Sequence, residues 1–147
     1  LTFEHFDRTL KTNLYGYFNI CQAAVPHLKT GGAIVMTGSV TGIMGNDQLL
    51  DYTMTKGGIH AFARSLGTHL APRGIRVNTI SPGWIMTDRQ LKQFVTPQVK
   101  RMLRERQCQP DLLKPDEIAN VALFLASTMS SAVTGQEILA DRGWQHS

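Results

Sequence analysis

The sequence has few cysteines and no metal-binding pattern. Its two cysteines, Cys21 and Cys108, stand far apart, and we expect both to be reduced thiols, with Cys21 buried on a helix. The five histidines also lack metal-ligand spacing, so the sequence predicts neither a metal site nor a catalytic histidine. These histidines are His5, His27, His60, His69 and His146.

Charge and long apolar runs are scarce as well. Charged residues make up 18% of the 147 residues, the net charge is +4, and the basic residues lack the interleaved aromatics that nucleic-acid binding favours. No apolar run approaches the ~18 residues that a membrane span needs, and no basic-then-apolar signal segment opens the sequence. We therefore expect a cytoplasmic globular protein that binds neither nucleic acid nor a membrane.

A third absence concerns glycine. Doubly wound α/β folds that bind dinucleotides contain a strand followed by a glycine-rich turn, which lets a pyrophosphate approach the N-terminus of the next helix. No Gly-x-x-x-Gly-x-Gly or Gly-x-Gly-x-x-Gly turn precedes a strand in this chain. The phosphate-binding part of such a fold is therefore not in the sequence.

Helix and strand patterns alternate along the chain. Thr2 fits an N-cap, and apolar residues recur at helical period until Pro26, where the helix should kink or fray. Inside the later long helix, Gly57 and Gly58 cost helix propensity, which suggests close packing against another backbone. The expected elements are a helix from Thr2 to about residue 25, a strand over 33–37, a loop over 40–50, a helix over 51–71, a strand over 75–80, a loop over 81–86, helical pieces over 87–94 and 97–106, a helix that starts at Pro115, and a strand over 137–140.

This order of elements, helix-strand-helix-strand-helix-strand, predicts the fold class. Alternation of this kind is typical of an α/β layer fold with a parallel sheet. The short apolar run over 33–37 is typical of a buried parallel strand. We expect a single domain over residues 1–147.

The most informative residues are Tyr52, Lys56 and Ser39. Positions i and i+4 share a helix face, so the phenol of Tyr52 and the ammonium of Lys56 should project side by side. The cation should lower the tyrosine pKa from its reference near ~10, so that the phenol can exchange a proton with an alcohol or a carbonyl. Ser39 follows the end of a strand, where ligands bind in open α/β sheets, and its hydroxyl could hold the same oxygen.

This trio closely resembles the active site of the short-chain dehydrogenase/reductase family. Asn13, in the run Lys-Thr-Asn-Leu-Tyr-Gly, sits where that family carries its fourth catalytic residue. Residues 81–87, Ser-Pro-Gly-Trp-Ile-Met-Thr, look like the family's loop over the nicotinamide, and residues 133–136, Val-Thr-Gly-Gln, resemble the lead-in to its last strand. Because the family's glycine-rich turn and Asn-Asn-Ala-Gly strand are absent, the chain resembles the C-terminal half of a doubly wound Rossmann fold, with strands five to seven and their helices.

The resemblance implies a role for each of these residues. Tyr52 would donate or accept the proton of the substrate oxygen, and Ser39 would orient that oxygen. Lys56 would bond the nicotinamide ribose hydroxyls, and Asn13 would hold a water that connects Lys56 to solvent. Read without the family, the same residues are an ordinary helix tyrosine, a surface lysine, a loop serine and an asparagine that distorts its helix. Four further residues would line the nicotinamide: Pro82, Gly83, Ile85 and Thr87.

The implied function is reversible hydride transfer between NAD or NADP and a secondary alcohol or ketone. The small-molecule substrate would be a sugar or a small polyol. A homodimer or homotetramer is also implied, because the family's helices around Asn13 and Tyr52 often pack against a partner subunit. The alternative is a truncated, non-catalytic assembly module that retains only this interface.

The end of the chain departs from the family. Asp141-Arg142-Gly143 replaces the common Asp-Gly-Gly. Arginine takes a positive φ less readily than glycine does. We therefore expect the terminal turn to differ from that of the family.

We predict that the 147-residue chain alone neither folds as a stable monomer nor binds a nicotinamide dinucleotide tightly. The strand over 33–37 would expose an unpaired apolar edge, and the phosphate-binding turn is missing. Titrating NADH into the purified chain and following its fluorescence should show weak binding, and size-exclusion chromatography should show self-association. Low-micromolar binding by a monomer would contradict this expectation.

Overall fold

Three parallel strands form the sheet of this computed structural model, which describes residues 1–144. The strand order is β1-β2-β3; β1 pairs with β2 along its whole length, and β3 pairs with the second half of β2. The predicted α/β class and parallel sheet are confirmed, whereas the prediction for His146 lies outside the described residues. The strands are β1 (Ala33–Thr37), β2 (Arg76–Pro82) and β3 (Glu137–Ala140).

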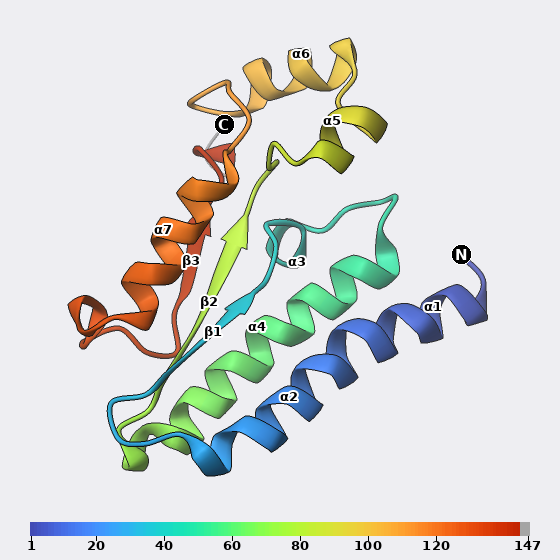
Figure 1. The fold of residues 1–147 in the computed structure, drawn as a ribbon. Helices are drawn as coiled ribbons and strands as arrows, with labels where there is room; N and C mark the ends of the chain where they lie inside the picture. Colours follow the sequence, from blue (N-terminus) through green and yellow to red (C-terminus); the bar gives the residue numbers. More distant parts are fainter. Residues whose placement is uncertain (145–147) are drawn as a thin grey trace.

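Helices cover both faces of this sheet (Figure 1). One face carries α4 (Leu50–Leu70), with α1 (Phe3–Leu10) and α2 (Gly16–Ala24) running alongside it, and the other face carries α7 (Pro115–Ala126). Two short helices, α5 and α6, lie beyond the carboxyl ends of the strands. The remaining elements are a π-turn (Lys11–Tyr15), α3 (Thr41–Met44), α5 (Asp88–Gln93), α6 (Pro97–Arg106) and 3₁₀ turns over Val25–His27, Ala71–Arg73 and Thr128–Ser130.

The core lies between β1, β2 and the helices α2 and α4. Cys21 is buried there, as predicted, and both cysteines are free thiols. A Cβ on Gly57 would lie 3.2 Å from the Gly42 carbonyl oxygen, so the expected close backbone packing within α4 is confirmed at Gly57. The core cluster consists of Cys21, Met36, Ile59, Ala63, Leu70, Ile75 and Val77.

Several predicted boundaries agree with the structure. Thr2 caps α1 by accepting a hydrogen bond from the His5 amide at 3.2 Å, and the helix at Pro26 tightens into a 3₁₀ turn. The helix over 97–106 and the strand over 137–140 have the predicted bounds. Local cap and proline chemistry therefore decides where α1 and α6 begin and where α2 ends.

Two boundaries were wrong. The predicted loop over 40–50 contains α3, because the Met44 and Gly45 amides bond back to the carbonyls of Val40 and Thr41 at 3.0 and 2.9 Å before Gly45 turns to a φ of 83°. The predicted loop that begins at Ser81 is still strand through Pro82. The ladder continues there because neighbouring strands supply partners, and a proline at the strand end needs no donor of its own.

The terminal turn holds an arginine in the left-handed region, and its expected difference from the family's turn stays a prediction. Arg142 adopts a φ of 57°, and it is the only non-glycine residue with a positive φ among residues 1–144. Its Nη2 donates to both carboxylate oxygens of Glu117 at 2.8 and 2.9 Å, and its Nη1 donates to Gln109 Oε1 at 3.1 Å. These contacts hold an arginine in a conformation that favours glycine.

We predict that Arg142→Gly is more stable than Arg142→Ala by about 1 kcal/mol, because both variants lose the ion pair and only alanine keeps the left-handed backbone strain. Urea unfolding of the full-length protein measures this difference. Equal midpoints with equal slopes would show that the backbone at residue 142 relaxes without cost.

Candidate active site

The site is built around the end of β1. The carbonyl oxygen of Thr37 accepts hydrogen bonds from Lys56 Nζ at 2.8 Å and from the Tyr17 hydroxyl at 3.2 Å. The Tyr17 hydroxyl in turn accepts from the Thr37 amide at 3.0 Å. The last residue of the strand is therefore bonded to side chains of both α2 and α4.

The structure brings Ser39, Tyr52 and Lys56 together at this end of the sheet. Lys56 Nζ lies 5.4 Å from the centroid of the Tyr52 ring, as the shared helix face predicts. Ser39 follows β1, and its hydroxyl lies near enough to the Tyr52 phenol to favour the phenolate. The same hydroxyl lies 3.0 Å from Thr41 Oγ1 and accepts from the Thr41 amide at 3.2 Å. Ser39 and Lys56 are 8% and 9% exposed, and Tyr52 is half-buried. The three polar groups therefore share one partly desolvated place.

The expectation that Lys56 lowers the pKa of Tyr52 was wrong for this chain. Burial raises the pKa of the Tyr52 phenol above its ordinary value, and the Ser39 hydroxyl acts in the opposite direction by favouring the phenolate. Burial likewise lowers the pKa of the Lys56 ammonium. Lys56 donates its short hydrogen bond to the Thr37 carbonyl oxygen. Desolvation and the Ser39 hydroxyl are the two largest influences on the pKa of Tyr52.

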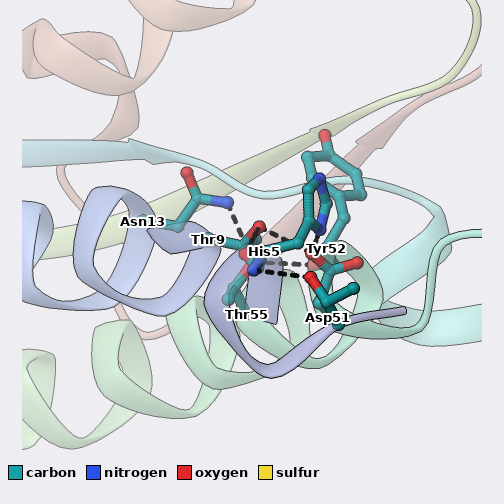
Figure 2. A network of polar contacts seen from close by, with 7 residues as sticks. His5, Thr9, Asn13, Asp51, Tyr52 and Thr55 are labelled. Carbon is teal, nitrogen blue, oxygen red and sulfur yellow. Dashed lines mark hydrogen bonds and ion pairs between the residues drawn. The ribbon is translucent and has the colours of Figure 1, made fainter. Parts of the chain in front are cut away.

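Asn13 lies in the π-turn between α1 and α2. Its amide nitrogen donates to Thr55 Oγ1 at 2.9 Å, and that hydroxyl donates to the Tyr52 carbonyl oxygen at 2.7 Å. Figure 2 shows the Asn13 amide nitrogen directed at Thr55. The asparagine is thus linked to the tyrosine backbone through one side chain, and it occupies a distorted helix segment as expected.

A second polar contact beside Tyr52 was not predicted. Asp51 is buried, and its Oδ2 accepts from Thr9 Oγ1 at 2.6 Å and lies 3.0 Å from His5 Nδ1 (Figure 2). The Thr9 hydrogen bond lowers the pKa of Asp51, with smaller help from backbone amides and His5. The sequence contains a sign of these contacts in its spacing. Thr9 and Asn13 are four residues apart, as are Asp51 and Thr55, and the first of each pair contacts the first of the other, the second the second.

The four residues predicted to line the nicotinamide lie at or after the end of β2, at the same end of the sheet. Pro82 ends the strand, and a Cβ on Gly83 would lie 3.0 Å from the Cα of Asp141, so the chain passes too close there for a side chain. Ile85 forms an isolated parallel bridge with Leu113. Thr87 caps α5 by accepting from the Gln90 amide at 3.2 Å, which leaves its hydroxyl hydrogen available.

Within residues 1–144, no three side chains of the types that bind metals gather closely enough to hold an ion. None of the helices described there combines the length and apolar character that crossing a membrane requires.

Comparisons with known proteins identify the family of the chain. Residues 1–145 match a protein family described as enoyl-(acyl carrier protein) reductase. The chain is 37% identical over 145 residues to a probable galactose dehydrogenase of Rhizobium meliloti, covering 97% of this chain and 57% of that protein. The chain spans about half the length of the curated relatives it matches.

Two solved structures from Brucella melitensis are also similar. One is a short-chain dehydrogenase/reductase of the glucose/ribitol dehydrogenase type, with a TM-score of 0.86, 34% identity, and coverage of 97% of this chain and 56% of that one. The other is a 3-oxoacyl-[acyl-carrier protein] reductase with bound NAD, with a TM-score of 0.88, 33% identity, and coverage of 100% and 54%.

We predict that Ser39→Ala raises the pKa of the Tyr52 phenol further, because the phenolate loses the hydroxyl that stabilises it. Ultraviolet titration of the full-length protein, with the Tyr52→Phe curve subtracted, isolates this one phenol. The exposed Ser131→Ala variant is the matched control and should leave the curve unchanged. A lower or unaltered phenol pKa in Ser39→Ala would contradict the contact.

Proposed function

The chain belongs to the short-chain dehydrogenase/reductase family, and from that premise we propose that it carries the catalytic residues of an NAD(P)-dependent oxidoreductase. The reaction is reversible oxidation of a secondary alcohol to a ketone. The observation that carries the proposal is the convergence of Ser39, Tyr52 and Lys56 at the carboxyl end of β1. Ligands of open α/β sheets bind at this end.

Each residue has one task in this proposal. Tyr52 transfers the proton to or from the substrate oxygen, and the Ser39 hydroxyl holds that oxygen in place. Asn13, through Thr55, fixes the backbone of Tyr52 and provides the start of a proton path to solvent. The raised phenol pKa keeps Tyr52 protonated in the free protein, which suits a proton donor to a carbonyl.

The side chains around Tyr52 fit a nicotinamide cofactor. The nicotinamide ring, when bound, supplies the hydride acceptor or donor. Lys56 uses one of its three ammonium hydrogens on Thr37, so the others can bond ribose hydroxyls. The Thr87 hydroxyl hydrogen would be a donor for the carboxamide, and Pro82, Gly83 and Ile85 would lie beside the ring, with Gly83 held close to Asp141.

The substrate we propose is a sugar or a small polyol. The proposal is supported by the names of a relative, a probable galactose dehydrogenase, and of a structural neighbour, a glucose/ribitol dehydrogenase. The cofactor is NAD or NADP; NAD is the one bound in a similar reductase. Two free cysteines accord with a reducing, cytoplasmic environment.

We also propose that the protein forms a homodimer or homotetramer through the face of α2 and α4. Tyr15 and Phe18 are 58% and 53% exposed there, beside Leu14 and Phe62, and such apolar side chains are normally covered. This face also favours the second candidate function, a non-catalytic assembly module. An oligomer without cofactor binding supports the module, whereas turnover with galactose, glucose or ribitol supports the enzyme.

We predict that Tyr52→Phe in the full-length protein lowers kcat about a hundredfold or more, because the proton donor is lost. Cofactor binding, measured by nicotinamide fluorescence, should change little since Lys56 and the β2 loop remain. The control is Ser131→Ala, which removes an exposed hydroxyl outside the site and should keep full turnover. Retained turnover in Tyr52→Phe would refute the proposed function.

A further inference from the structure

A buried polar cluster lies behind the candidate active site. His60 on α4, Ser81 on β2 and Glu137 on β3 contact one another pairwise. Ser81 Oγ lies 3.0 Å from His60 Nε2 and donates to Glu137 Oε1 at 2.7 Å, while His60 Nδ1 lies 3.0 Å from the same oxygen. His60 is 4% exposed and Ser81 is fully buried, so no substrate can reach them.

The cluster packs closely against Gly38, the residue that precedes Ser39. A Cβ on Gly38 would collide with the His60 imidazole and lie 2.8 Å from Ser81 Oγ. The imidazole also limits Gly42, where a Cβ would lie 3.0 Å from His60 Cε1. The imidazole is therefore the nearest group at Gly38, whereas at Gly42 the backbone of Lys56 and Gly57 lies closer, at 2.8 Å.

Backbone pairing completes this support. The Gly38 amide donates to the Ile80 carbonyl at 2.7 Å, and the Val40 amide donates to the Pro82 carbonyl at 3.3 Å. Ser81 stands between these two acceptors on β2. The side chain that bonds His60 thus belongs to the strand segment that holds the backbone on both sides of Ser39.

The charges around the imidazole come from two elements. Burial lowers the pKa of His60, Glu137 on β3 raises it, and Arg64 and Lys56 on α4 lower it. Apolar side chains at all three positions could fill the same space at little or no cost in stability, whereas removing His60 alone leaves Glu137 and Ser81 without that partner. Unlike an apolar filling, the polar cluster forms its hydrogen bonds only when α4, β2 and β3 lie at fixed distances from one another.

We propose that His60, bonded to Ser81 and Glu137, is a positioning residue that fixes Gly38 and so sets the Ser39 hydroxyl against the Tyr52 phenol. The inference rests on the proposed function for the roles of Ser39 and Tyr52. It adds to that function a residue on α4 that acts through Ser39 without touching substrate or cofactor.

A double-mutant cycle on the full-length protein tests this inference. The variants are His60→Leu, which keeps the volume and removes the polar contacts, Ser39→Ala, and the two combined. The first readout is the pKa of the Tyr52 phenol, which needs no substrate, and the second is kcat with the best alcohol among galactose, glucose and ribitol. His60→Gln, which keeps polar atoms, tests rescue.

We expect His60→Leu to raise the phenol pKa in the same direction as Ser39→Ala and to lower kcat roughly tenfold, because small displacements of a catalytic group are costly. KM for the cofactor should change less than about twofold. The double variant should lose no more than Ser39→Ala alone, since both changes remove one contact. His60→Gln should recover most of the loss.

Additive losses in the double variant, or an unaltered phenol pKa in His60→Leu, would overturn the inference and leave the proposed function intact. An unaltered phenol pKa and full turnover in Ser39→Ala would overturn both. Leu70→Ala, buried at the far end of α4, controls for lost stability: an equal fall in kcat there would also overturn the inference. Where His60→Leu does not fold, Ser81→Ala takes its place in the cycle.

Discussion

The carbonyl oxygen of Thr37 is the contact on which the site depends. It is the last carbonyl of β1, and it accepts from Lys56 on α4 and from Tyr17 on α2. Since Lys56 and Tyr52 share a helix face, fixing the ammonium also fixes where the phenol emerges. A sheet edge, two helices and the candidate catalytic groups are thereby joined through one acceptor.

Two groups of polar contacts lie near this acceptor, one on the α1 side and one on the sheet side. On the α1 side, Asp51 accepts a hydrogen bond from Thr9, and Thr55 accepts one from Asn13 (Figure 2). These two bonds hold the first turn of α4. On the sheet side, His60 contacts β2 and β3 below the Ser39 loop. The apolar core between α2, α4 and the strands supplies the free energy of folding, and these hydrogen bonds specify which arrangement is reached.

Sequence reasoning recovered what local chemistry determines. The N-cap at Thr2, the helix at Pro115 and the shared face of Tyr52 and Lys56 follow from cap preferences and helical period. It failed where a distant segment decides. The strand extends through Pro82 because β3 pairs with it, and the Tyr52 pKa rises because the fold buries the phenol. Glu117 and Gln109, which are also distant in the sequence, hold the turn at Arg142.

The π-turn over Lys11–Tyr15 sets the rotational phase between α1 and α2. Such a turn accommodates one residue more than a regular helix would, and each helical residue rotates the chain by roughly 100°. Removing that extra residue would leave two good helices with unchanged propensities. It would also swing His5 and Thr9 away from Asp51 while α2 stayed docked on the sheet. This irregularity therefore allows one continuous helix to pack against the core through α2 and against the first turn of the Tyr52 helix through α1.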